Sequence, residues 1–234
     1  MTKNWMKEAA ILAAGLVLMG FLLRSAVVNL KERDRIVSVR GLAEQEVTAN
    51  KVTWPLVLKD LGNDLPELYK RITAKNATVI KFLKQNGLKD EEISVGAPDI
   101  IDMAAERYSN NESPYRYNVT SVITVTSSQV DKIRKLISEQ GSLLQQGIAL
   151  TGGDYRYNVT YEYTDLNKIK PQMIEQATKN AREAAQKFAA DSESKLGKIK
   201  SARQGQFEIT DRDPNTPYIK KVRVVTGLDY YLED

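Results

Sequence analysis

The sequence predicts an α+β fold, in which mostly antiparallel strands form a sheet and three helices pack on one face of it. Apolar residues recur at steps of three and four, the helical spacing, in three segments of the chain. Most other segments alternate apolar with polar residues, and turn-rich loops join several of them in pairs, which is typical of hairpins. The hexapeptide Tyr-Arg-Tyr-Asn-Val-Thr occurs twice, at residues 115–120 and 155–160, which indicates a chain built from strand-and-helix modules.

The first predicted element is a membrane helix over residues 9–30. Residues 9–23 carry no charge, and the span reaches the roughly 20 residues that a bilayer requires if Arg24 extends its guanidinium to the headgroups. A cleaved signal peptide with a basic start is the alternative, but the residues around Arg24 lack the small side chains that cleavage needs. A buried core helix would also be apolar, yet this stretch has no polar face. We therefore predict a membrane anchor or signal anchor over residues 1–30.

A charged linker over residues 31–35 and one domain over residues 36–234 follow the anchor. More Lys and Arg residues follow the anchor than precede it, which by charge alone favours a cytoplasmic domain. We nevertheless expect export, because large domains cross a membrane despite their charge. The predicted location is the inner membrane, with a single pass and the domain in the periplasm. If the segment is cleaved, a periplasmic protein is expected instead.

Two strand patterns precede the first helix of the domain. Pro55 in the second pattern lacks an N–H group, which indicates an edge strand or a bulge. Asp64 and Glu67 form a capping-box-like start for the helix, and Gly87 supplies a left-handed residue at its end. The apolar positions follow the helical spacing, apart from one gap near Asn76. They are Leu65, Leu68, Ile72, Val79 and Leu83.

The middle of the domain predicts two strands, over residues 93–105 and 115–126, with a polar turn at residues 109–114. A second helix follows from Ser127 or Ser128, and Gly141 is expected to end it. Its inward residues are Val130, Ile133 and Ile137. The next strand region includes the second hexapeptide. It places five residues on one face: Tyr155, Tyr157, Val159, Tyr161 and Tyr163.

The third predicted helix is the longest. Asp165 begins a helical turn, Pro171 suits a first helical position, and Gly197 is expected to end the helix. Its apolar stripe consists of Ile174, Ala177, Ala181, Ala184 and Phe188. The alanines allow close packing, either on a sheet of the same chain or on a second copy. Strands over residues 198–210 and 219–232 follow. The last strand presents one apolar face, formed by Val222, Val224, Leu228, Tyr230 and Leu232.

Composition excludes several kinds of site. The 234 residues include no His and no Cys, so disulfides, thiol nucleophiles, imidazole bases and Cys/His zinc sites are excluded. The net charge is only +4, and no long run of like charges indicates a nucleic-acid partner. We therefore expect a protein that is not an enzyme, with no catalytic residue, cofactor or metal, and with no nucleic acid bound.

Three weaker features have simpler explanations than a site. Residues 151–154 contain the only adjacent glycines, but they lack the Lys of a phosphate loop, so a turn is the better interpretation. Two sets of carboxylates could in principle hold a cation: Asp99, Asp102 and Glu106, and Asp211 with Asp213. The first set lies in a strand pattern, without the spacing of an oxygen-ligand loop, and the second lies in a Pro- and Asn-rich turn. We interpret them as solvated edge charges and as turn residues.

The candidate ligand-binding residues are three tyrosines and two arginines around the repeated hexapeptide: Tyr155, Tyr157, Tyr161, Arg116 and Arg156. Rings on one strand face, with arginines beside them, could stack on a sugar or hold an anionic polymer. The same rings could instead form part of the core, and full burial would remove the basis for a binding site.

The domain resembles the SIMPL family, on diffuse motifs that extend over residues 36–234. They are residues 37–41, 44–48, 82–87, 93–95, 117–120, 127–141, 181–189 and 195–199. Proteins of this family are exported bacterial envelope proteins that form oligomeric assemblies, and some are linked to oxidative-stress defence. The resemblance implies a self-associating envelope protein and no catalytic residue. We expect a homo-oligomer that contacts the lipid bilayer through its N-terminal helix.

Overall fold

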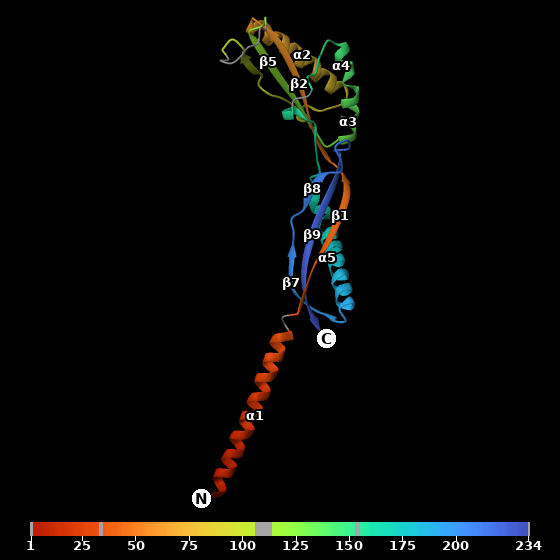
Figure 1. Cartoon of the computed structure of the whole chain (residues 1–234). Helices are drawn as coiled ribbons and strands as arrows, with labels where there is room; N and C mark the ends of the chain where they lie inside the picture. Colours follow the sequence, from red (N-terminus) through yellow and green to blue (C-terminus); the bar gives the residue numbers. More distant parts are fainter. Residues whose placement is uncertain (1, 33–34, 106–113, 153–154, 234) are drawn as a thin grey trace. The chain divides into compact units, whose positions relative to one another are not determined.

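The computed structural model describes residues 2–32, 35–105, 114–152 and 155–233 (Figure 1). An N-terminal helix, α1 (Thr2–Glu32), precedes two antiparallel sheets with helices packed on them, which confirms the predicted α+β class. The chain forms two compact units. Unit 1 comprises Met1–Gln45, Asn167–Glu208 and Val222–Asp234, and unit 2 comprises Glu46–Leu166 and Ile209–Lys221.

Helix α1 contains the apolar segment that the sequence predicts. Its segment Lys7–Ser25 has 19 residues and a mean hydropathy of 1.7. At 1.5 Å per residue this segment is roughly 28 Å long, close to the thickness of the hydrocarbon core. The side chains described in this segment are all exposed. By length and composition, α1 is consistent with a signal anchor or a signal peptide.

The sheet of unit 2 is built around β2 (Lys51–Gly62). It pairs antiparallel with β5 (Tyr117–Ser127) along its whole length, from Val52 opposite Ser127 to Gly62 opposite Tyr117. The short strand β6 (Thr160–Glu162) pairs on the other side of β2, but only with Lys51–Thr53. Pro55 therefore lies where this side of β2 has no strand partner among the described residues, as its missing N–H predicts. Strands β3 (Ile93–Val95) and β4 (Asp99–Asp102) pair with the far side of β5.

Helices α2 (Leu65–Gln85) and α3 (Val130–Glu139) pack on this sheet and form the larger core. Asp64 caps α2 by accepting a hydrogen bond from the Glu67 N–H at 2.9 Å, and Gly87 has a left-handed φ of +77°, as predicted. Helix α3 ends at Glu139, next to the expected stop at Gly141, but a further helix that was not predicted follows directly. Helix α4 (Gly141–Gln145) begins there and buries Leu143, and the left-handed residue that follows it is Gly147.

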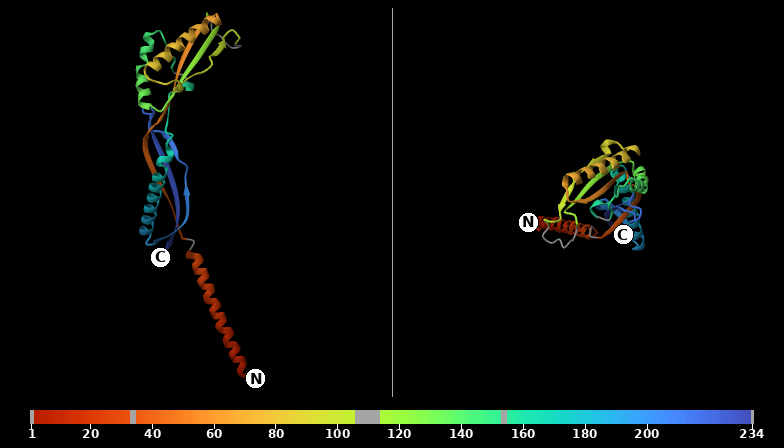
Figure 2. Two further views of the ribbon diagram at one scale, coloured as in Figure 1. Left: turned by 180° about the vertical axis from the view of Figure 1, so that it is seen from behind. Right: turned by 90° about the horizontal axis from the view of Figure 1, so that it is seen from above.

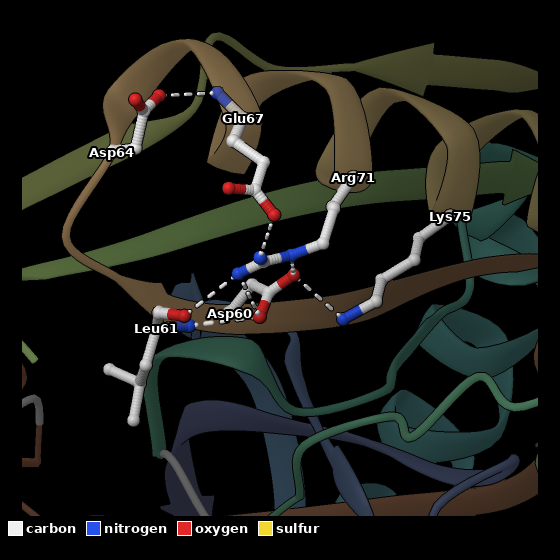
Figure 3. Close-up of polar contacts among 6 residues, drawn as sticks. All are labelled: Asp60, Leu61, Asp64, Glu67, Arg71 and Lys75. Atoms are coloured by element: carbon white, nitrogen blue, oxygen red, sulfur yellow. Dashed lines mark hydrogen bonds and ion pairs between the residues drawn. The ribbon is translucent and has the colours of Figure 1, made fainter.

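Ion pairs and hydrogen bonds within a charged cluster join the first turns of α2 to the end of β2 (Figure 3). The Asp60 carboxylate accepts hydrogen bonds from Arg71 Nε and Lys75 Nζ, both at 3.0 Å, and Arg71 also donates to the Leu61 carbonyl and to Glu67. Burial raises the pKa of Asp60, but the hydrogen bonds from Arg71 and Lys75 outweigh it and leave this pKa below its ordinary value. The carboxylate therefore stays ionised and holds α2 in place at neutral pH.

The sheet of unit 1 has the order β1 (Ile36–Thr48), β9 (Ile219–Glu233) and β7 (Lys195–Gln204). Strand β8 (Glu208–Asp211), nearly all of which belongs to unit 2, also pairs with β9. Helix α5 (Leu166–Asp191) runs along one face of this sheet (Figure 2). The predicted inner face of β9 is confirmed: Val222, Val224, Leu228 and Tyr230 are buried, and Leu232 is half-buried.

The bounds and the buried stripe of α5 differ from the prediction. Pro171 lies inside the helix, because α5 starts at Leu166. The buried residues follow steps of four, and they are Met173, Ala177, Ala181, Ala185 and Ala189. Ala177 and Ala181 of the predicted stripe are therefore confirmed as buried, whereas Ile174 and Ala184 are only half-buried and Phe188 is 61% exposed. The helix ends before Glu193, which has a left-handed φ of +53°, and Gly197 lies in β7.

Candidate functional site

The second hexapeptide does not form the tyrosine-rich strand that its alternation predicts. Tyr155–Tyr157 forms a 3-10 turn, η2, and Tyr155 is 84% exposed. The first copy is a strand because Tyr117 and the residues after it pair with β2 on one side and with β4 on the other. Of the second copy only Thr160 lies in a strand, β6, which is paired along one edge. Local alternation alone does not make a strand without a partner.

The five predicted binding residues are not brought together. Arg116 pairs with Asp102 at 2.9 Å and lies beside Tyr117, at the end of the sheet where β5 begins. Arg156 lies over its neighbour Tyr157. Tyr161 lies opposite Val52, at the other end of β2 and roughly 30 Å along the strand from the Arg116 end. Tyr161 lines a groove of unit 2.

That groove, of about 770 Å³, lies within unit 2 and is lined by residues of α3, β6 and the loop before β9. The ring of Tyr161 meets the ring of Tyr218 edge to face, with centroids 6.1 Å apart and planes at 70°. The Cζ atom of Arg134 lies 3.4 Å from the centroid of the Tyr218 ring. Lys135, Pro214 and Pro217 also line this groove.

The guanidinium of Arg134 is held in place before any ligand arrives. One face stacks on Tyr218, and Nη1 lies 3.3 Å from the Asp131 carboxylate. A fixed fork of N–H donors loses little freedom when it binds an anion. Burial raises the pKa of the Tyr161 hydroxyl, and the charge of Arg134 offsets part of that rise. Tyr161 is therefore neutral at physiological pH and can donate a hydrogen bond.

The loop that carries Tyr218 is organised by Asp213. Its carboxylate accepts hydrogen bonds from the N–H groups of Asn215 and Thr216, at 2.8 and 2.9 Å, from the Thr216 hydroxyl and from Arg212. The hydrogen bonds from the Thr216 hydroxyl and from Arg212 contribute most to a pKa of about 2 for Asp213. The carbonyl of Tyr218 accepts a hydrogen bond from the Ala49 N–H at 2.8 Å, which anchors the end of the loop.

Replacing Asp213 by asparagine is expected to loosen this wall of the groove in a pH-dependent way. Because the folded-state pKa is depressed, the carboxylate stabilises the fold above about pH 4, and this contribution is lost as the pH falls toward 2. Thermal melting of wild type and Asp213→Asn should therefore differ at pH 6 and converge near pH 2. A constant difference across this range would contradict the role of the charge.

The other predicted carboxylates have structural partners. Asp102 pairs with Arg116, and Asp211 pairs with Lys220, which is itself buried. Asp99 is exposed, whereas Glu106 and residues 153–154 lie outside the described residues. Among the residues that the structure describes, no group of three or more acidic side chains is placed to hold a metal ion.

Sequence reasoning identified Tyr161 but missed Arg134, Lys135 and Tyr218. Arg134 and Lys135 look like ordinary exposed charges of an amphipathic helix, and only their position beside the loop distinguishes them. The segment Pro-Asn-Thr-Pro-Tyr at residues 214–218 was the available signal, because two prolines next to a tyrosine form a stiff aromatic wall.

Comparisons with known proteins give one finding. A family model described as "SIMPL: Protein of unknown function (DUF541)" matches residues 37–224, which is most of the chain. No curated protein matches the sequence.

Proposed function

The chain belongs to the SIMPL (DUF541) family, and on this premise we propose that it is a non-enzymatic envelope protein that α1 holds in the inner membrane. The apolar length of α1 supports an anchor, and the resemblance to exported envelope proteins supports a periplasmic domain. A role in envelope or oxidative-stress defence, which the resemblance implies, would then be exercised by binding and assembly.

We propose that the groove of unit 2 binds an acidic envelope glycan. The observation that carries this proposal is the guanidinium of Arg134, which stacks on Tyr218 at the open groove. Lys135 adds a second cation, and its side chain is 76% exposed. The aromatic rings offer apolar faces and edges to a sugar, while the cations pair with its carboxylate or phosphate groups. A neutral glycan would use the rings but would gain nothing from the charge of the two cations.

Replacing Arg134 by glutamine is expected to weaken binding of an acidic polysaccharide at least tenfold, because the fixed cation is lost from the groove. The full chain in neutral detergent would be titrated calorimetrically with a polyuronate, and with an uncharged glucan for comparison. Arg182→Gln removes the same charge from an exposed position of α5 in unit 1 and should bind like wild type. Equal binding by Arg134→Gln and wild type would contradict the proposal.

Self-association is the second proposed property, and the apolar edge of unit 2 supports it. Strand β4 carries Ile100, which is 49% exposed, and Ile101, and the nearby strand β3 carries the exposed Val95. Among the described strands, β4 pairs only with β5, so its other edge can add a strand from a second copy.

Replacing Ile100 by lysine is expected to shift the full chain in detergent from oligomer to smaller species, because a charge opposes both apolar contact and edge pairing. Analytical ultracentrifugation measures this shift. Leu144→Lys, at a 63% exposed position on α4, is the matched control and should keep the oligomer. A wild-type chain that stays monomeric at high concentration would overturn the self-association proposal.

A further inference from the structure

The face of the unit 1 sheet turned away from α5 carries a hollow of about 490 Å³. Gly41, Val39 and Ala43 of β1 are buried on the side of α5, so the alternating residues Ser38 and Arg40 lie on the opposite face. The hollow is lined by these two residues, by Val39 between them, and by residues of β9 and of the segment that ends β7.

The strand register places two arginines on either side of one glycine. Gly227 of β9 lies opposite Arg203 of β7. On the other side, the contacts Arg35–Leu232, Ser38–Asp229 and Glu44–Arg223 fall in one antiparallel register. In that register Arg40 of β1 lies opposite Gly227. Neighbouring strands are about 4.8 Å apart, so the backbones of the two arginines are separated by roughly 10 Å, with no side chain between them.

The cations around this glycine are only partly neutralised. The guanidinium of Arg40 makes no ion pair or hydrogen bond with another residue in the described part of the chain. Arg203 is 83% exposed and lies 3.8 Å from the Asp229 carboxylate. Both oxygens of that carboxylate accept hydrogen bonds, from the hydroxyls of Ser38 and Ser201. Lys200, whose Nζ lies over the Tyr231 ring, adds a third cation near Asp229, so the group carries a net positive charge.

Packing does not explain why residue 227 is glycine. A Cβ atom at this position would meet only the Arg203 carbonyl oxygen, at 3.8 Å, which is an ordinary contact, and the backbone is not left-handed. Glycine weakens the interior of a strand, where it often marks a bulge, a bend, or the close approach of a ligand or another backbone. The pairing of β7 with β9 is regular from Ser201 to Gln204, so no bulge lies at Gly227 on this side. The missing side chain leaves the floor between Arg40 and Arg203 open.

We propose that the Arg40–Gly227–Arg203 cradle binds a phosphate dianion, either free or as a phosphomonoester. Two guanidinium groups carried by the strands on either side of Gly227 match an anion that has acceptor oxygens on both sides. A tetrahedral dianion meets this requirement, whereas the two oxygens of a single carboxylate satisfy only one fork. The Gly227 floor lets the anion lie against the sheet between the two forks.

The decisive variant is Gly227→Val, which fills the floor of the cradle without removing a charge. Valine favours a strand, and the position has room for its side chain. The melting temperature of the Gly227→Val protein should therefore equal or exceed that of wild type. Calorimetric titration of the full chain with inorganic phosphate at pH 8 and constant ionic strength should show one site in wild type. Affinity should fall at least tenfold in Gly227→Val, Arg40→Gln and Arg203→Gln, and stay unchanged in Arg182→Gln, at an exposed position of α5.

The source of the phosphate is distinguished by repeating the titration in nanodiscs. If the cradle binds a lipid phosphomonoester, discs that contain phosphatidic acid will weaken the apparent affinity for inorganic phosphate relative to neutral discs. If it binds free phosphate, both discs will give the same affinity. No binding to wild type at millimolar phosphate, or wild-type affinity in Gly227→Val, overturns the proposal. Should Gly227→Val fail to fold, unchanged affinity in both arginine variants overturns it equally.

Discussion

Replacing Gly41 by alanine is expected to disrupt the packing of α5 against its sheet and to destabilise unit 1. A Cβ atom at this position would lie 1.9 Å from the Ala177 carbonyl oxygen and 2.4 Å from the Ala181 amide nitrogen. Both are backbone atoms of a helix, so no side-chain rotation relieves the clash, and the whole helix must move. Overpacking of this kind costs about 3 kcal/mol or more.

The loss is measured by thermal unfolding of the full chain in detergent, with hydrogen exchange to locate it. We expect amides of α5 and β1 to lose protection, because these are the elements forced apart. Gly141→Ala is the matched control, since nothing lies within 4 Å of a Cβ there and the backbone is not left-handed. This control should be as stable as wild type or slightly more stable. A Gly41→Ala protein with wild-type melting would show that α5 does not approach β1 so closely.

Replacing Ser121 by alanine is expected to destabilise unit 2 by about 2 kcal/mol, because it leaves a polar group of α2 without its partner. Ser121 is 1% exposed in β5. Asn76 Nδ2 donates to the Ser121 hydroxyl at 2.9 Å, and this hydroxyl donates back to Asn76 Oδ1 at 3.2 Å. Both hydrogen bonds cross from the helix to the sheet beside the apolar core.

Adding Asn76→Leu to Ser121→Ala is expected to recover most of that stability, because removing both partners leaves no unsatisfied amide. Urea unfolding of the two single variants and the double variant gives the coupling energy directly. A double variant less stable than both single variants would contradict a pair whose two members depend on each other.

The Asn76–Ser121 pair shows which features of the fold can be predicted from the sequence and which cannot. The gap in the apolar spacing of α2 is visible at Asn76, but the partner lies 45 residues away on β5, and helical spacing carries no information about it. The Asp64 cap and Gly87 were predictable, because each is a local requirement of a helix end. The end of α5 was not, because Glu193 adopts a left-handed conformation that glycine usually takes.

The candidate site was predictable only in part, for a similar reason. Alternation predicted both hexapeptides as strands, yet only the first has partner strands along both sides, and pairing is a tertiary property. Tyr161 was found because it continues the alternation of the second hexapeptide. Arg134 and Tyr218 come from distant segments, and their stacking arises from the way the loop before β9 folds back onto α3.

The central claim is that α1 holds the protein in the membrane and that the domain is exported. Cysteine labelling in spheroplasts tests this topology most directly. The sequence contains no cysteine, so Tyr155→Cys, at an 84% exposed position, and Thr2→Cys, before the apolar segment, each carry one thiol. With a membrane-impermeant maleimide, we predict that Tyr155→Cys is labelled in intact spheroplasts. Thr2→Cys should be labelled only after lysis, and both proteins should lie in the membrane fraction. Labelling of Thr2→Cys alone in intact spheroplasts would place the domain in the cytoplasm, and a mature soluble chain without residue 2 would show a cleaved signal.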